Sequence, residues 1–347
     1  MATKISGHGS RTRACIEPLE RRCLLSASPA PIPTHSASLI PASFNWKQVN
    51  NSPLARLEAS AVAVGNKLYL FGGYGVDNPK WEATTETDAF DPATKTWTRM
   101  ADMPEGLTHI GAATDGRYIY AAGGYVTNYI TGWQTFGTRD VWRYDTVLNQ
   151  WSAFVPLPAP RAAGALLIIG SQLHYVDGVD ASQRGTTDHW ALNLKSLTPH
   201  WVRYAPLPFS RNHIAAAVVN GKIYIAGGQV SADDASAACS DVLMWDPLHP
   251  AAWQRMPDLP QPRSHAIAFA VDGQLVVVDG STTGQRVLSS IIAFNPLTNN
   301  WSTLTNSFPA ARIGPAGDIV DGMLVITTGY YQRLRAGTWE SLLPLSL

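Results

Sequence analysis

Arginine is the residue type whose spacing in this chain first suggests a chemical site. Five arginines, with one leucine in the same register, recur at intervals of 49 to 54 residues. The series is Arg56, Leu107, Arg161, Arg211, Arg263 and Arg312. Guanidinium groups around one opening would suit carboxylates or vicinal hydroxyls. Ion pairs that tie loops together are the structural alternative, with the nearby aspartates Asp88, Asp140, Asp188 and Asp241 as partners.

Histidines and aromatic residues accompany this series. His109, His213 and His265 each stand two residues after a member of the arginine series. Hydrogen bonding is the simplest role for these histidines. Aromatic residues crowd several long segments between the arginines, and Trp, Tyr and Arg are enriched in binding hot spots. The alternative for these aromatics is packing of the loops against each other. The candidate ligand-binding residues are Arg56, Arg161, Arg211, Arg263, Arg312, His213, His265, Trp81, Tyr125, Trp133, Tyr330 and Tyr331.

Catalytic motifs are missing around these candidates. The sequence has no phosphate-binding glycine loop, no Ser-His-Asp order and no metal-ligand spacing, so we expect neither a cofactor nor a metal. Glu82, Glu86, Asp177 and Asp279 could serve as catalytic carboxylates, but none stands in a recognisable acid–base motif. Cys239 is the one cysteine after residue 43, which excludes a disulfide framework and a cysteine-based zinc site there.

An internal repeat positions the candidates. Pairs of a small residue and glycine end an apolar stretch at Gly72-Gly73, Gly123-Gly124, Asp177-Gly178, Gly227-Gly228, Asp279-Gly280 and Thr328-Gly329. Each pair begins 16 residues after a member of the arginine series. Tryptophans share the period at Trp46, Trp97, Trp151, Trp201, Trp253 and Trp301. The arginine series, the small-Gly pairs and the tryptophans thus recur six times at nearly constant spacing from one another, which indicates a repeat protein. The tryptophans are expected to belong to its core.

Each repeat predicts four short antiparallel strands. In residues 211–255, two apolar stretches meet at Asn220-Gly221, a pair that suits a two-residue hairpin. A third strand ends at Trp245-Asp246-Pro247, and a fourth carries Trp253. Strands that are this apolar must be covered on both faces, as when sheets pack around an axis.

The two ends of the chain complete the sixth sheet. After Thr328-Gly329 the sequence holds one more strand, so the fourth strand of this sheet has to come from Phe44 to Val49. We therefore predict an all-β propeller of six blades, the last closed by the N-terminal strand. Tight hairpins lie on one face, and the arginine series and long loops lie on the other, the long-loop face.

The Gly-Gly, Asp-Pro and Trp pattern resembles the kelch repeat. It is clearest in Tyr69-Leu-Phe-Gly-Gly, Phe90-Asp-Pro and Trp97, and it covers residues 44–347. Kelch propellers include binding scaffolds and enzymes, so the resemblance leaves both open. The kelch copper radical oxidases, with seven blades and a Tyr–Cys cross-link, do not fit this sequence. The six-bladed N-acetylneuraminate mutarotase (epimerase) of this type, an exported protein, is the nearer enzymatic resemblance.

Residues 1–43 form a separate basic leader with a proline-rich linker. The stretch from Glu17 to Ala27 resembles the LEPR-XLL motif of exported bacterial surface proteins and predicts export, the alternative being a cytoplasmic protein. Residues 44–347 carry 21 Lys and Arg against 24 Asp and Glu, which disfavours nucleic acid as a partner. No apolar run is long enough for a membrane-spanning helix.

The leading functional hypothesis is a non-catalytic binding module at or outside the cell surface, and we expect it to be a monomer. Its ligand is a carbohydrate or a protein held by the long-loop face. A sugar mutarotase or epimerase is the alternative, and a structural surface component is the third.

Overall fold

The computed structural model describes residues 44–75, 82–127, 134–230 and 237–343. Within these ranges the regular structure is all β, and no helix is long and apolar enough to cross a membrane. The LEPR-XLL-like stretch, Trp81 and Trp133 lie outside the described residues. The boundary between the leader and the propeller at residue 43 stays a prediction.

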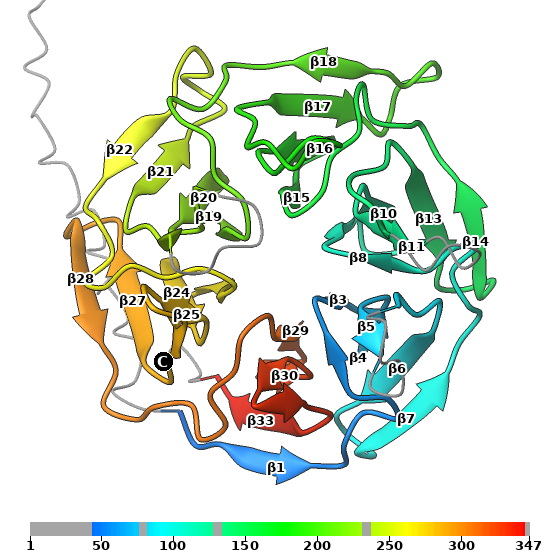
Figure 1. Ribbon diagram of the computed structural model, residues 1–347, viewed down its shortest axis with the longest axis vertical. Coiled ribbons are helices and arrows are strands. Elements are labelled where there is room, and N and C mark those ends of the chain that lie inside the picture. Colours follow the sequence, from blue (N-terminus) through cyan, green and yellow to red (C-terminus); the bar gives the residue numbers. More distant parts are fainter. Residues whose placement is uncertain (1–43, 76–81, 128–133, 231–236, 344–347) are drawn as a thin grey trace, which may run out of the picture. The chain divides into compact units, whose positions relative to one another are not determined.

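Six four-stranded antiparallel sheets, the blades, surround a central axis in the described part of the chain (Figure 1). Blade one contains β3 (Ser60–Val64), β4 (Lys67–Phe71), β6 (Thr87–Asp91) and β7 (Thr96–Arg99). Blade two contains β9 (Gly111–Thr114), β10 (Tyr118–Ala122), β13 (Val141–Asp145) and β14 (Gln150–Ala153). Blade three contains β15 (Ala165–Ile169), β16 (Gln172–Val176), β17 (His189–Asn193) and β18 (Trp201–Arg203).

The second half of the ring repeats this order. Blade four contains β19 (Ala215–Val219), β20 (Lys222–Ala226), β21 (Val242–Trp245) and β22 (Gln254–Met256). Blade five contains β23 (Ile267–Val271), β24 (Gln274–Val278), β27 (Ile291–Asn295) and β28 (Asn300–Thr303). Blade six contains β29 (Ala316–Val320), β30 (Met323–Thr327), β33 (Thr338–Leu342) and β1 (Lys47–Val49).

Short ribbons decorate the long-loop face. They are β2 (Arg56–Leu57) with β5 (Tyr74–Gly75), β11 (Tyr125–Thr127) with β8 (Leu107–Thr108) and β12 (Gln134–Thr135), β25 (Ser281–Thr282) with β26 (Arg286–Val287), and β31 (Tyr330–Tyr331) with β32 (Arg333–Leu334). These ribbons lie next to the positions of the arginine series or directly after the small-Gly pairs. The opposite face has tight hairpins such as Asn220-Gly221, in which both residues have positive φ as predicted.

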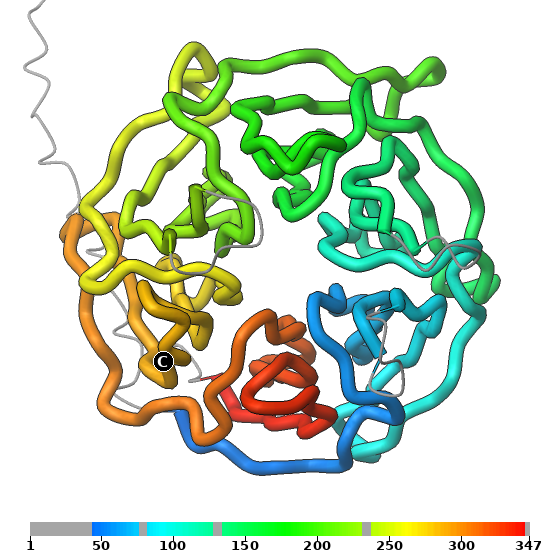
Figure 2. Tube along the Cα trace, in the orientation of Figure 1, coloured from blue at the N-terminus to red at the C-terminus, as the bar shows by residue number. Residues whose placement is uncertain are grey.

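The predicted closure of the last blade by the N-terminal strand is confirmed. β1 pairs antiparallel with β33, with Gln48 opposite Trp339, although the two strands are nearly 300 residues apart in sequence. Figure 2 shows the blue N-terminal segment along the outer edge of the red C-terminal blade. Phe44 is 2% exposed and packs with Trp46 and Phe308 in the core between blades five and six.

Backbone hydrogen bonds join each blade to the next at the small-Gly pairs. The amide of the second residue of each pair donates to the carbonyl of the next member of the arginine series, at 2.7 to 3.1 Å in all six cases. The last of these bonds runs from Gly329 to Arg56 and joins blade six to blade one. The first residue of the pair has positive φ even where it is Asp177, Asp279 or Thr328, so the departures from Gly-Gly keep the same geometry.

The repeated tryptophans form a second set of links between blades. The indole nitrogens of Trp97, Trp151, Trp201, Trp253 and Trp301 each donate to a backbone carbonyl in the preceding repeat, at 2.8 to 3.2 Å. Each ring thus fills the space between neighbouring sheets and also satisfies its polar atom. This arrangement explains why the tryptophans recur with the period of the fold.

Candidate functional site

The arginine series lies inside the blades and ties strands together. Arg56 is fully buried, donates to the carbonyls of Gly72 and Glu86, and pairs with Asp88. Arg161 pairs with Asp188, and Arg211 pairs with Asp241 at 2.5 Å. These contacts connect the start of the innermost strand with the start of the third strand in the same blade.

Arg263 and Arg312 make the same connection mainly through backbone oxygens. Arg263 donates to the carbonyls of Asp279 and Ser290, both at 3.0 Å. Arg312 donates to the carbonyls of Thr328 at 2.6 Å and Gly337 at 2.9 Å. Burial lowers the pKa of each guanidinium to about 10, and Asp279 opposes this shift. The two arginines therefore remain charged at neutral pH while they are almost fully buried.

The expectation that the arginines ring the channel mouth is not met, because their side chains turn back into the blades. The mouth is formed instead two residues further along each repeat. The six positions are Glu58, His109, Ala163, His213, His265 and Gly314, one from each blade in order. We call them the mouth ring. They line a pocket of about 160 Å³.

The backbone holds the mouth ring in one conformation. All six residues have φ between 51° and 57°, a region that residues other than glycine seldom occupy. The amides of His109, Ala163, His213, His265 and Gly314 each donate to the carbonyl of the preceding ring position, at 2.9 to 3.3 Å. This chain of hydrogen bonds across blades explains how strained φ values are maintained at five non-glycine positions.

The mouth ring gathers three imidazoles and one carboxylate. The rings of His213 and His265 lie 4.0 Å apart, and those of His109 and His213 lie 5.0 Å apart. Glu58 places carboxylate oxygens 4.0 Å from His109 Nε2 and 3.9 Å from His265 Nε2. Burial lowers the pKa of His109 to about 3 and that of His265 to about 4, and it lowers the pKa of His213 well below its usual range. The three imidazoles are therefore neutral at physiological pH.

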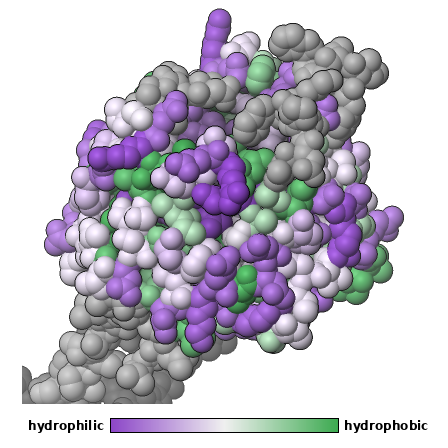
Figure 3. Space-filling model, turned by 60° about the horizontal axis from the view of Figure 1, so that its bottom comes forward, coloured by the Kyte–Doolittle hydropathy of each residue, from purple (hydrophilic) through white to green (hydrophobic). Residues whose placement is uncertain are grey.

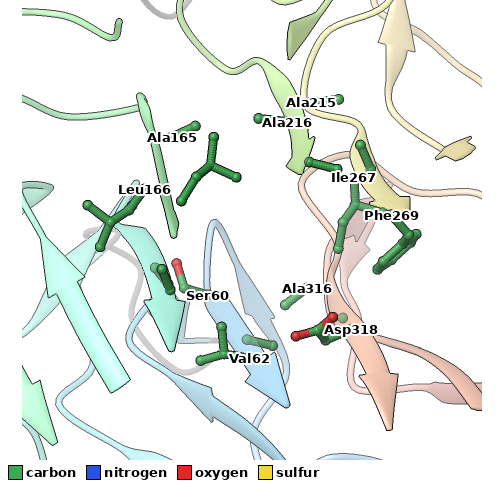
Figure 4. Close-up of a pocket in the computed structure, with 18 of the residues that line it drawn as sticks. Ser60, Val62, Ala165, Leu166, Ala215, Ala216, Ile267, Phe269, Ala316 and Asp318 are labelled. Carbon is green, nitrogen blue, oxygen red and sulfur yellow. The ribbon is translucent and has the colours of Figure 1, made fainter. Parts of the chain in front are cut away.

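Below the mouth, the channel between the innermost strands has largely apolar walls. It encloses about 460 Å³ and is lined mainly by small and aliphatic residues such as Val62, Ala165, Ala216 and Ile267 (Figure 4). Asp318 is the one ionisable residue of this lining. It accepts hydrogen bonds from the amides of Ala63 and Ile319, and burial raises its pKa. The polar chemistry of the channel is thus concentrated at its mouth.

A larger groove lies beside the channel, near the seam between blades five and six. This seam groove has a volume of about 880 Å³. Its lining includes Phe308, Arg312, Tyr331, Arg333, Arg335 and Trp339, together with the small residues of the segment 309–311. Arg335 lies over the ring of Tyr331 at 5.8 Å. In the described part of the chain, neither Arg333 nor Arg335 forms an ion pair.

The loop aromatics divide between packing and exposure. Tyr125 is 2% exposed and packs against Phe136 and the mouth histidine His109. An external ligand does not reach this ring, because loop packing covers it. Tyr331 is 42% exposed, and Tyr330 beside it is half-buried. Among the described residues, Tyr331 in the seam groove is thus the aromatic candidate that is exposed to solvent.

Cys239 is half-buried at the end of a loop of blade four. Its thiol donates to the carbonyl of Ala237 at 3.3 Å. Burial raises the pKa of the thiol, with a smaller opposing effect from Arg211. The reactive thiolate is therefore disfavoured at this position.

Comparison with known proteins agrees with this architecture. The model of the KLHDC2/KLHL20/DRC7 Kelch-repeats domain matches residues 35–178, and the Kelch motif matches residues 210–260. The chain is 27% identical to a Kelch repeat-containing protein of Arabidopsis thaliana, over 84% of this chain and 72% of that protein. It is 26% identical to Kelch-like protein 15 of Danio rerio, over 69% of this chain but only 41% of that protein.

A solved structure shares the fold. The structure of YjhT superposes with a TM-score of 0.61 at 17% identity and covers 72% of this chain and 84% of that one. At this identity the likeness concerns the fold alone. The matched family models and the six sheets of the described residues show that the chain contains kelch repeats folded as a β-propeller.

Proposed function

We propose that this protein is a non-catalytic binding module that holds a protein ligand, through an acidic segment, in the seam groove of its long-loop face. The observation that carries the proposal is the pair Arg333 and Arg335. Their guanidinium groups line an open groove and form no ion pair within the described residues, whereas the arginines of the repeat series are engaged inside the blades.

The chemistry of the groove fits carboxylates on an extended chain. Guanidinium groups bind carboxylates through paired, charge-assisted hydrogen bonds. Tyr331 adds an exposed aromatic ring, and such rings are enriched in binding hot spots. Ala310, Ala311 and Ala336 also line the groove, and their small side chains leave space for the main chain of a peptide. The groove is larger than the pocket at the mouth ring, which favours a peptide segment over a single sugar.

The hydropathy of the surface shown in Figure 3 supports a ligand that is bound mainly through polar contacts. Hydrophilic residues are spread over it, and the hydrophobic residues form small patches between them rather than one continuous area. A ligand that docked through a large apolar surface would require such an area. Recognition by charge and hydrogen bonding is the better match for this surface.

The mutarotase alternative has weaker support. It requires a carboxylate within hydrogen-bond reach of an arginine or histidine at the channel mouth. Glu58 is the carboxylate there, and its distances of 3.9 and 4.0 Å to two imidazole nitrogens exceed that reach. A carbohydrate that bears carboxylates remains a ligand class that the experiment below separates from a peptide.

Binding to arrays tests the proposal. The full chain is applied to an array of Asp- and Glu-rich peptides beside matched Asn and Gln peptides, and to a glycan array that includes sialylated glycans. We expect retention on acidic peptides, weakened by added salt. It should be lost in Arg333→Ala/Arg335→Ala and kept in Arg117→Ala, whose arginine is exposed near the opposite face.

Each contrary outcome has a defined meaning. Retention on sialylated glycans alone would replace the protein ligand by a carbohydrate. Equal retention of the double variant on acidic peptides would reject the seam groove as the site. NMR detection of sialic acid anomerisation catalysed by the protein would contradict a non-catalytic role.

Export completes the proposal and depends on the leader sequence. The LEPR-XLL-like stretch from Glu17 to Ala27 supports a location at or outside the cell surface. A reporter fused behind residues 1–43 and expressed in a bacterium whose exported proteins carry this motif should be found outside the cytoplasm. A reporter that remains in the cytoplasm would contradict this part of the proposal.

A further inference from the structure

Three side chains of the mouth ring have the chemistry and arrangement of a metal site. Glu58, His213 and His265 each offer one ligand atom, and these atoms lie within 4.8 Å of one another. Two imidazoles and one carboxylate are a ligand set that proteins use for Zn²⁺ and for other first-row divalent metals, with a further coordination position left open.

The residues before the mouth histidines orient the imidazole rings. His213 Nδ1 donates to Asn212 Oδ1 at 2.6 Å, because an amide oxygen can only accept. The Nδ1 atoms of His109 and His265 are hydrogen-bonded to the hydroxyls of Thr108 at 2.8 Å and Ser264 at 3.1 Å. A partner on Nδ1 fixes the ring and directs Nε2 to a metal, as the outer shell of metal sites commonly does.

The repeat itself provides a comparison for these partners. The three mouth-ring positions that are not histidine follow Leu57, Ala162 and Ile313, which have no side-chain polar atom. A polar partner thus stands before each mouth histidine and at none of the other three positions. This correlation within one chain indicates that the Nδ1 contacts serve the imidazoles rather than the general geometry of the blade.

His213 has a buried, unsatisfied ring nitrogen at the mouth ring. His213 is 7% exposed, and its Nε2 has no hydrogen-bond partner among the described residues. A buried nitrogen lone pair without a partner is costly in free energy. His213 contributes one ring nitrogen to the group of candidate ligand atoms that also includes the Glu58 carboxylate, so a cation at their centre would bond to this ring.

Gly314 leaves room for the carboxylate. A Cβ at this ring position would lie 2.5 Å from Glu58 Oε1. Metal–ligand bonds of Zn²⁺ are about 2.0–2.2 Å, so the three side chains would move inward by roughly 0.5–1 Å on binding. The pocket of about 160 Å³ that they line gives the ion and a further ligand space.

We propose that Glu58, His213 and His265 bind a first-row divalent cation at the mouth of the central channel. His109 lies against Glu58 and His213 and completes the polar wall of the site. The open coordination position faces the pocket, where water or a ligand oxygen can bind. This site is separate from the seam groove and does not depend on the proposed function.

Zn²⁺ and Co²⁺ are the probes for the test. The full chain is loaded with Zn²⁺, dialysed and analysed for metal per chain by mass spectrometry, and its affinity is measured by calorimetry. The variants are Glu58→Gln and His213→Gln. The matched control is His249→Gln, which changes an exposed histidine that lies 3.4 Å from Asp246.

We expect the wild-type chain to bind one Zn²⁺. The variants Glu58→Gln and His213→Gln should lose this ion, and the control His249→Gln should retain it. The fall in affinity should exceed the roughly 100-fold that loss of an outer-shell partner alone can cause. Co²⁺ bound at this site should show ligand-field bands without the sulfur charge-transfer absorption that Cys15 and Cys23 of the leader would give.

Two results would overturn the proposal. One is a wild-type chain that retains no Zn²⁺ after dialysis. The other is a metal content that stays the same in Glu58→Gln and His213→Gln, which would assign the bound ion to another part of the chain. If His213→Gln does not fold, Glu58→Gln decides, since Glu58 lies at the pocket with 15% of its side chain exposed.

Discussion

Gly314 lies directly against the carboxylate of Glu58 in the mouth ring. A Cβ built on the glycine would meet Glu58 Oε1 at 2.5 Å and Leu57 Cδ1 at 3.0 Å. Blade six thus provides the space into which the acidic side chain of blade one projects. Ala163, at the equivalent position of blade three, shows that a Cβ is otherwise compatible with this conformation.

Gly314→Ala tests this relationship. A non-glycine residue at positive φ costs roughly 1 kcal/mol of unfolding free energy by itself. We expect Gly314→Ala to cost more than this, because the new Cβ also displaces the Glu58 carboxylate. The measurement is urea unfolding of Gly314→Ala, Glu58→Ala and the double variant. A smaller cost of Gly314→Ala in the Glu58→Ala background is the expected coupling. Additive effects would show that the two residues do not interact.

Arg56→Leu tests the structural role of the arginine series. Leucine already occupies this register in blade two as Leu107, so the side chain itself fits the fold. The change leaves Asp88, which is 1% exposed, without its buried partner, and we expect a cost of about 3–5 kcal/mol in urea unfolding. Addition of Asp88→Asn should recover part of this loss, because it removes the stranded charge.

Arg117→Leu is the control for this change. Arg117 pairs with Asp145 at 2.7 Å on an exposed part of blade two. Exposed ion pairs contribute little, so the unfolding midpoint should stay close to that of the wild type. Equal losses in Arg56→Leu and Arg117→Leu would contradict the distinction between the buried and exposed arginines.

The buried pair His174 and His189 predicts a pH dependence of stability. His174 Nδ1 and His189 Nε2 lie 2.9 Å apart, and both rings pack against Trp245. Burial lowers the pKa of His174 to about 4 and that of His189 to about 3, from an ordinary value of 6.5. Between pH 6.5 and these values, the unfolded chain binds more protons than the folded one. Stability should therefore fall as the pH is lowered through this window, by about 1.4 kcal/mol per pH unit for each proton.

His189→Val isolates this contribution. Valine stands at the same register in blade two as Val141 and in blade four as Val242. Unfolding free energies measured from pH 7 to pH 4.5 should decline less steeply in the variant than in the wild type. The histidines of the mouth ring are present in both proteins, so they cancel in the comparison. Parallel curves would contradict the assignment to this pair.

The fold could be predicted from the sequence because each repeat carries the same contacts. The small-Gly pairs and the series position form the backbone bonds between blades, and the tryptophans bond to the preceding repeat. Residues that make a contact in every blade recur with the period of the blade. The pairing of β1 with β33 could be inferred because the last repeat lacked a strand.

The site was less accessible to sequence analysis. Glu58, His213 and His265 are 52 to 207 residues apart, so they show no local ligand spacing, and the expectation of no metal came from that absence. The signal that was available is their common offset of two residues from the arginine series. Their positive φ could not be anticipated, because glycine occupies only one of the six positions.

Deletion of the N-terminal strand tests the central claim, that the two chain ends jointly complete the ring that places the mouth and the seam groove. A chain that starts at Leu54 lacks β1 and Phe44, whose burial alone contributes about 2–3 kcal/mol, and leaves the edge of β33 unpaired. A chain that starts at residue 38 is the control. Thermal unfolding should show a fall of at least about 10 °C for the shorter chain only, whereas equal melting of the two chains would contradict the account.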